Sequence, residues 1–110
     1  MADQPGYVDG KHYPEYVETV KQLKAEKRYD EALALLDRIM DATEQESAVQ
    51  GYGVAPWCYE QTALIHRKNG DQENEIAVLE RFARQQHAPG VKPAKLLERL
   101  QSLKEPSWRR

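Results

Sequence analysis

Two segments of the chain repeat one pattern, in which a helical stretch, a short polar break and a second helical stretch follow one another. They are residues 13–42 (YPEYVETVKQLKAEKRYDEALALLDRIMDA) and residues 56–84 (PWCYEQTALIHRKNGDQENEIAVLERFAR). One helical hairpin cannot bury its own apolar face, whereas two stacked hairpins share a core and leave a groove. The pattern therefore predicts an all-α fold of two stacked antiparallel helix–turn–helix hairpins, an architecture typical of binding proteins rather than catalysts.

Glycine, proline and aspartate indicate where the helices begin and end. The segment GYGVAP at 51–56 is expected to stop the second helix. In the second hairpin Gly70 can take the left-handed conformation that closes a helix, and Asp71 can cap the next one. We expect Asp30 to cap the second helix of the first hairpin. Four leucines at helical spacing predict a C-terminal helix over 93–104 that caps the stack.

The two ends of the chain differ from the helical part. Residues 1–12 hold one proline and two glycines among polar residues, so we expect a flexible N-terminal arm. The helical domain then spans 13–104, and 105–110 forms a C-terminal tail. Within this tail Trp108 belongs either to a frayed end or to a short linear motif.

Composition limits the kind of protein. A chain of 110 residues has room for one domain with a modest core. Its net charge of −2 gives no overall attraction to nucleic acid or to anionic membranes. No window approaches the roughly 20 apolar residues of a membrane span. Because Cys58 is the single cysteine, the fold needs no disulfide, and we expect a cytoplasmic protein.

Cysteine and histidine do not occur at the spacing of a metal or nucleophilic site. His66 follows Cys58 by eight residues, which is about 12 Å along a helix and too far for contact. His12 and His87 fall in predicted loops at opposite ends of the body. We expect His66 to be a packed core histidine, and we expect neither a metal nor a cofactor.

Acidic pairs are the other candidates for chemistry. Glu44 and Glu46, and also Glu73 and Glu75, are expected on helix surfaces as solvated carboxylates. No HExxH helix, glycine-rich phosphate loop or serine elbow occurs in the sequence. We therefore do not expect an enzyme.

The two hairpins resemble tetratricopeptide repeats, and this resemblance covers about two thirds of the chain. The turn segment 28–32 (RYDEA) matches the family signature, Tyr16 and Tyr59 take its aromatic position, and Ala63 takes a small position. Glu75 departs from the pattern, because it stands where the second repeat has a small alanine. The two repeats are also about nine residues further apart than the family period. Short blocks such as GKHYPEYV resemble small bacterial proteins of unassigned role.

The resemblance implies a concave groove lined by the first and third helices. A basic groove with one tryptophan would suit an acidic peptide or a C-terminal carboxylate. Structural explanations of these residues remain open. The basic residues also suit the negative C-terminal ends of their helices, and the tryptophan could be a packing residue. The family's two-carboxylate clamp is not expected, because the positions of its lysine and asparagine hold other residues. The predicted partner-binding residues are Val17, Lys21, Lys24, Trp57, Glu60, Leu64, Arg67 and Lys68.

These observations predict a protein–protein interaction module that binds a peptide or a partner helix in the groove. The alternative is a regulatory subunit or a homodimeric scaffold that acts through its convex surface or through the 43–55 loop. We expect no binding of nucleic acid or membrane.

Overall fold

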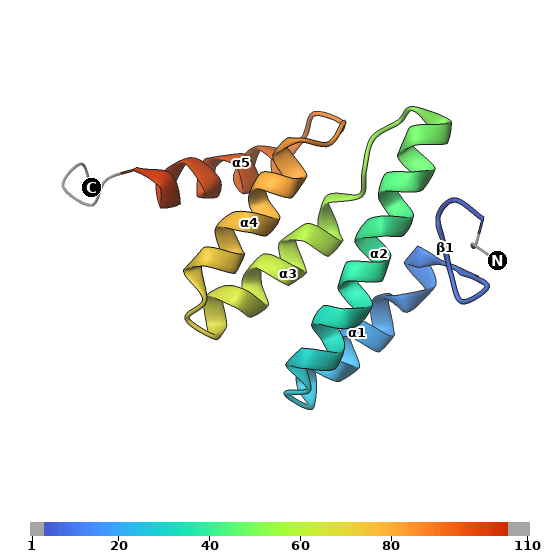
Figure 1. Ribbon diagram of the computed structural model, residues 1–110, viewed down its shortest axis with the longest axis horizontal. Helices are drawn as coiled ribbons and strands as arrows, with labels where there is room; N and C mark the ends of the chain where they lie inside the picture. The colour runs from blue at the N-terminus through green and yellow to red at the C-terminus, as the bar shows by residue number, and fades with distance from the viewer. Residues whose placement is uncertain (1–3, 106–110) are drawn as a thin grey trace.

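The computed structural model describes residues 4–105, and in this range the chain is mostly helical, which confirms the all-α expectation (Figure 1). The strands in this range are two residues long and form one antiparallel pair. The elements in chain order are β1 (Tyr7–Val8), β2 (Lys11–His12), the 3-10 helix η1 (Tyr13–Tyr16), α1 (Val17–Ala25), α2 (Tyr29–Gln50), α3 (Pro56–Lys68), α4 (Gln72–Ala83) and α5 (Val91–Lys104).

The helices pack in the order of the chain. Helix α1 lies against α2, α3 lies against α2 and α4, and α5 lies against α4 and α3. Figure 1 shows α1 and α2 running in opposite directions, with α3 and α4 beside them and α5 at the far end. The result is an elongated body with extents of 49 × 34 × 24 Å.

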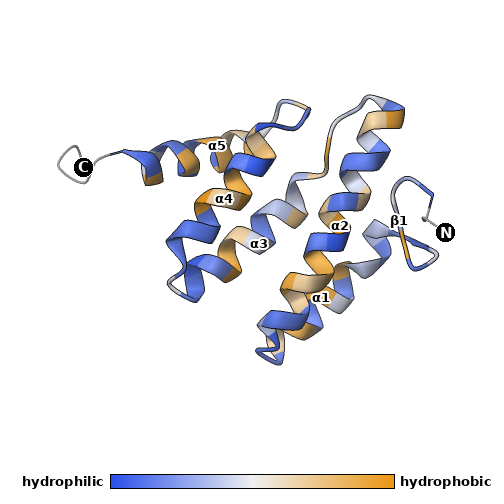
Figure 2. Cartoon of the chain, in the orientation of Figure 1, coloured by the Kyte–Doolittle hydropathy of each residue, from blue (hydrophilic) through white to orange (hydrophobic). Residues whose placement is uncertain are grey.

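The core lies along the seams between these helices. Every helix is amphipathic, as the mixed hydrophobic and hydrophilic turns in Figure 2 show. Tyr59 of α3 and Phe82 of α4 are fully buried, and their ring centroids are 5.2 Å apart. Ala32 and Ala63 are also buried, and their small side chains allow neighbouring helices to approach closely. The remaining fully buried apolar residues are Val20, Leu36, Ile39, Cys58, Ile65 and Leu79.

Helix α2 has 22 residues and accounts for the long spacing between the hairpins, because the chain remains helical to Gln50. It ends at Gly51, whose φ of 78° is the left-handed conformation that closes a helix. The loop that follows packs on the turn after α4: the Val54 N–H donates to the Gln86 carbonyl at 2.8 Å. Val54 is only 5% exposed, so this part of the 43–55 loop belongs to the core.

The expectation of a flexible arm at 1–12 is wrong for the part that the structure describes. Residues 4–12 contain the β1–β2 hairpin, in which Val8 is 2% exposed and packs on α2. The Tyr16 hydroxyl donates to the Val8 carbonyl at 2.6 Å. Asp9 accepts two hydrogen bonds from Arg38 of α2, at 2.6 and 2.8 Å. Long-range contacts therefore order a segment that carries no periodic pattern of its own.

Glu46 anchors the same hairpin from the end of α2. Its Oε2 atom lies 2.6 Å from His12 Nε2, and its Oε1 atom accepts a hydrogen bond from the Tyr52 hydroxyl. Gly6, with φ at 89°, lies directly over this carboxylate: a Cβ atom there would be 2.2 Å from Oε2. Glu46 is 9% exposed, so the expectation of a solvated carboxylate at this position is wrong.

The expected caps are partly confirmed. Gly70 has φ at 71°, and Asp71 caps α4 by accepting a hydrogen bond from the Asn74 N–H at 3.1 Å. Asp30, by contrast, lies inside the first turn of α2, whose N-cap is Arg28 without a side-chain hydrogen bond. An acidic residue in the first turn still suits the positive end of the helix dipole, which explains the misassignment.

Candidate partner-binding groove

Two hollows lie between α1 and α3, on the side of the molecule where the groove is expected. The apolar hollow has a volume of about 240 Å³ and the basic hollow about 400 Å³. The apolar hollow is lined by Tyr13, Pro14, Val17, Ile39, Ala55, Trp57 and Cys58. The basic hollow is lined by Lys24, Ala25, Tyr29, Leu64, Ile65 and Lys68.

The apolar hollow joins two of the predicted residues, Val17 and Trp57, which are both half-buried. Trp57 is one of the residues that line this hollow. Cys58 lies at the inner side and is fully buried. Burial raises the pKa of this thiol to about 12, which favours the protonated thiol near neutral pH.

The basic hollow joins three further predicted residues, Lys24, Leu64 and Lys68. Lys24 Nζ donates to the side-chain carbonyl of Gln61 on α3. Lys68 Nζ lies 5.7 Å from the centroid of the Tyr29 ring. These contacts, among residues 4–105, are with neutral groups rather than with carboxylates.

The other three predicted residues are paired elsewhere. Lys21 is exposed and lies 3.4 Å from Glu18 on its own helix. Glu60 accepts from Lys92 of α5 at 2.7 Å, and therefore points away from α1. Arg67 donates to Glu75 of α4 at 3.1 Å. The structure thus leaves two of the four predicted cations, Lys24 and Lys68, directed at the groove.

Arg67 belongs to an ionic cluster that joins three helices, here called the Glu75 cluster (Glu75, Arg67 and Arg99). Glu75 of α4 is 1% exposed and accepts from the Nε atoms of Arg67 and Arg99, at 3.1 and 2.9 Å. Burial would raise the pKa of this carboxyl, but the two guanidinium groups outweigh it and lower the pKa. The expectation of a solvated Glu75 is therefore wrong: a paired carboxylate fills the place of the small alanine.

The groove also uses residues that the sequence did not single out. Gln61, and not its neighbour Glu60, reaches α1, because Gln61 accepts from Lys24 whereas Glu60 is paired with Lys92 of α5. Tyr29 forms the floor under Lys68. Its place in the turn signature indicated the fold and gave no signal for this position.

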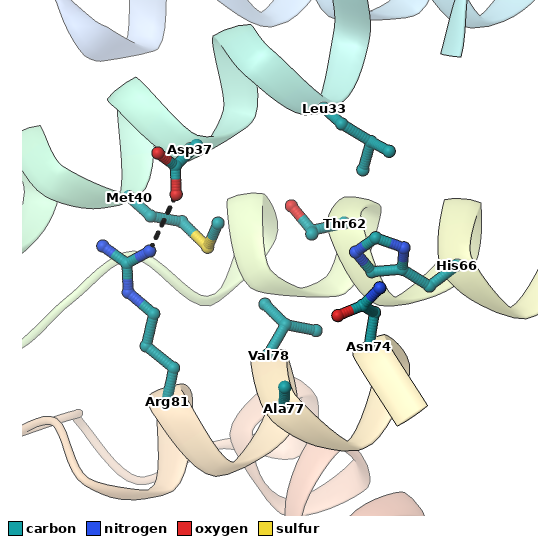
Figure 3. A pocket seen from close by; sticks show the side chains of 9 residues that line it. All are labelled: Leu33, Asp37, Met40, Thr62, His66, Asn74, Ala77, Val78 and Arg81. Atoms are coloured by element: carbon teal, nitrogen blue, oxygen red, sulfur yellow. Dashed lines mark hydrogen bonds and ion pairs between the residues drawn. The ribbon is translucent and has the colours of Figure 1, made fainter. Parts of the chain in front are cut away.

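His66 does not lie in the core as expected. Its ring is half-buried and lines a separate cleft between α2 and α4 (Figure 3). A fully buried imidazole would need a hydrogen-bond partner inside the protein. At the open cleft, the His66 ring is accessible to solvent instead. His87 stacks on Phe82 with ring centroids 4.6 Å apart, and His12 pairs with Glu46.

Neither a metal centre nor a membrane span emerges from the described residues. Across 4–105 no group of three or more His, Cys, Asp or Glu side chains is arranged to hold a metal ion. None of the helices in that range is both long and apolar enough to cross a bilayer. No protein-family model, no curated protein sequence and no solved structure matches the chain.

Proposed function

We propose that the chain is a protein-interaction module of the tetratricopeptide-like type, which binds an acidic peptide or partner helix between α1 and α3. The observation that carries this proposal is the pairing of an apolar hollow with a second hollow that bears two lysines. The buried small residues Ala32 and Ala63 support the tetratricopeptide-like interpretation. A cytoplasmic location is part of the proposal, and a fold that depends on no disulfide supports it.

The spacing of the two hollows defines the ligand. Val17 and Lys24 are seven residues apart on α1, which corresponds to about 10 Å along the helix axis. An extended peptide covers that distance in about three residues, and a helical one in about seven. The ligand therefore carries an apolar side chain for the Trp57 hollow and an aspartate or glutamate at one of these two spacings.

The expected affinity is modest. Burial of one large apolar side chain contributes about 1.5–3 kcal/mol. Each exposed pair between a lysine and a carboxylate adds about 0–1 kcal/mol and weakens with salt. These contributions sum to no more than about 5 kcal/mol, so a dissociation constant in the millimolar range is expected after the cost of ordering the peptide.

A displayed random-peptide library tests the proposal. Panning on the folded chain is expected to enrich peptides with an apolar residue and an acidic residue at the stated spacing. The double variant Lys24→Glu/Lys68→Glu is expected to lose these peptides. Lys95→Glu, a single reversal at an exposed position of α5 outside both hollows, is the control and retains them.

Two results would overturn the proposal. One is enrichment of peptides without acidic residues. The other is equal binding of the enriched peptides to the charge-reversed groove and to the control variant.

The alternative surface, the 43–55 loop, is less open than the sequence indicated. Tyr52 is 55% exposed, although its hydroxyl donates to Glu46. Tyr52→Ala therefore tests this loop, whereas Val54→Ala tests the fold because Val54 is buried. The oligomeric state of the unmodified chain, measured by sedimentation velocity, tests the homodimeric scaffold.

A further inference from the structure

The charges of the helices are separated in a way that the net charge of −2 conceals. Helices α2 and α4 together carry nine acidic and two basic side chains, whereas α1, α3 and α5 together carry three acidic and eight basic ones. Because the groove lies between α1 and α3, it belongs to the basic set. The cleft between α2 and α4 lies in the acidic set.

This second site, here called the α2–α4 cleft, shares no residue with either hollow of the groove. Its volume is about 240 Å³. Figure 3 shows the apolar side chains of Leu33, Met40 and Val78 pointing into it from both sides, and Arg81 reaching across towards α2. The full lining is Leu33, Asp37, Met40, Thr62, His66, Asn74, Ala77, Val78 and Arg81.

Arg81 and Asp37 of the cleft lining belong to an ionic cluster, here called the Arg81 cluster (Arg81, Asp37, Asp41 and Glu44), whose other two members adjoin the cleft through Arg81. Arg81 donates to Asp37 at 3.0 Å, to Asp41 at 2.7 Å and to Glu44 at 2.7 Å. Burial alone would lower the pKa of Arg81, but the three carboxylates, Glu44 foremost, raise it. One guanidinium thus faces three carboxylates, which leaves two negative charges in excess.

The excess charge is accessible. The Asp37 and Asp41 side chains are 63% and 58% exposed, and Arg81 bonds a single oxygen of each. Each aspartate therefore retains an oxygen that can accept a further hydrogen bond. Glu44 is different, because its Oε2 atom accepts from both Arg81 and the Tyr59 hydroxyl.

We propose that the α2–α4 cleft docks a basic segment of a partner protein. A lysine or arginine side chain of that segment lays its aliphatic stem on Met40 and Val78 and directs its cation to Asp37 and Asp41. The charge of the cleft excludes an anionic ligand, and its apolar walls favour a long side chain over a bare metal ion.

A second copy of this chain is a poorer occupant. Five of the eight basic side chains of α1, α3 and α5 are already in ion pairs within the molecule, among them Lys92 with Glu60, Arg99 with Glu75 and Lys104 with Glu80. Breaking these ion pairs would cost about as much free energy as new pairs with the cleft of a second copy would contribute. A head-to-tail contact of two different faces would also generate an open chain of molecules rather than a closed dimer.

An NMR titration tests the proposal with a short lysine- and leucine-containing peptide. Its counterpart, with glutamate in place of every lysine, is the matched control ligand. The basic peptide is expected to shift the amide signals of Met40, Asn74 and Val78 in the isotope-labelled chain. Asp37→Asn/Asp41→Asn is expected to weaken binding about tenfold, because two charge pairs are lost.

Two variants control for the fold and for general charge. Asp30→Asn removes an exposed carboxylate from the same helix, outside the cleft, and is expected to leave the affinity unchanged. Ala77→Arg keeps the Arg81 cluster intact but fills the cleft from an exposed position, and is expected to abolish the shifts.

Three outcomes overturn the proposal. They are shifts that the acidic peptide reproduces, shifts that persist in Ala77→Arg, and self-association at low salt that Asp37→Asn/Asp41→Asn abolishes, which would make a second copy the occupant. The proposal is independent of the groove, because Lys24→Glu/Lys68→Glu is expected to leave the titration unchanged.

Discussion

The Glu75 cluster and the Arg81 cluster both link α4 to neighbouring helices through ion pairs, but with opposite charge at their centres. In the first, one buried carboxylate receives two arginines, and in the second, one arginine receives three carboxylates. Glu75 is 1% exposed, whereas Asp37 and Asp41 are more than half exposed. The comparison indicates that the buried cluster serves the fold and that the open cluster retains charge for a partner.

Glu75→Ala is expected to produce the largest effect, a loss of about 2–3 kcal/mol in the free energy of unfolding. The variant leaves Arg67 and Arg99 without a carboxylate and opens a void between α3, α4 and α5. Arg67 and Arg99 are themselves 46% and 36% exposed, so water limits the loss. Urea unfolding measures it.

Glu73→Ala, an exposed position in the same first turn of α4, is the control and is expected to cost less than about 1 kcal/mol. Equal losses in the two variants would show that the buried cluster contributes nothing beyond the charge at the helix terminus.

The pH dependence of stability is expected to show the contribution of the Glu75 cluster. The pKa of Glu75 is lowered from its usual 4.5, so its pairing stabilises the fold above that value. This contribution is lost as the pH falls from about 4.5 through the lowered pKa of the folded state. Melting temperatures of the parent chain should therefore fall more steeply below that pH than those of Glu75→Gln. Parallel curves would contradict the assignment.

Arg81→Ala is expected to cost about 1–2 kcal/mol, less than Glu75→Ala, because the carboxylates it leaves are more exposed. Arg81→Lys retains the charge but cannot reach three carboxylates at once, and should lie between the parent and the alanine variant. Thermal unfolding compares the three chains, with Arg84→Ala as the exposed control. The comparison of the clusters would be reversed if Arg81→Ala were the more destabilising change.

The groove lysines are expected to give the smallest effect on stability. Lys24→Glu/Lys68→Glu should lower the free energy of unfolding by no more than about 1 kcal/mol, because both lysines contact neutral groups and their main contribution is to the C-terminal dipoles of α1 and α3. Chemical denaturation measures this change alongside peptide binding. A large loss would assign these residues to the fold instead.

The helices were predictable because their information is local. Apolar residues at helical spacing and Gly70–Asp71 place α3 and α4 within a few residues of their observed bounds. The β1–β2 hairpin was not predictable: two-residue strands show no period, and their anchor, Glu46, lies 34 residues beyond His12. Its order comes from contacts that only the folded chain brings together.

The candidate site divides in the same way. Helical spacing placed Val17, Lys24 and Lys68 beside the hollows, because residues on one helix keep their relative positions. Arg67 was misassigned because its partner Glu75 lies on another helix and Arg99 lies 24 residues further on. The sequence shows which side of a helix is apolar, but not which neighbouring helix neutralises each charge.

The length of α2 has a consequence for any attempt to convert this chain into a regular repeat. The last turns of the helix carry Glu46, the residue on which the N-terminal hairpin is held. Trimming α2 to the length of its neighbours would remove the Glu46 contact with His12 and leave the Arg38–Asp9 pair as the hairpin's ionic tie to this helix among residues 4–105. An engineer who shortens α2 must therefore redesign the hairpin with it.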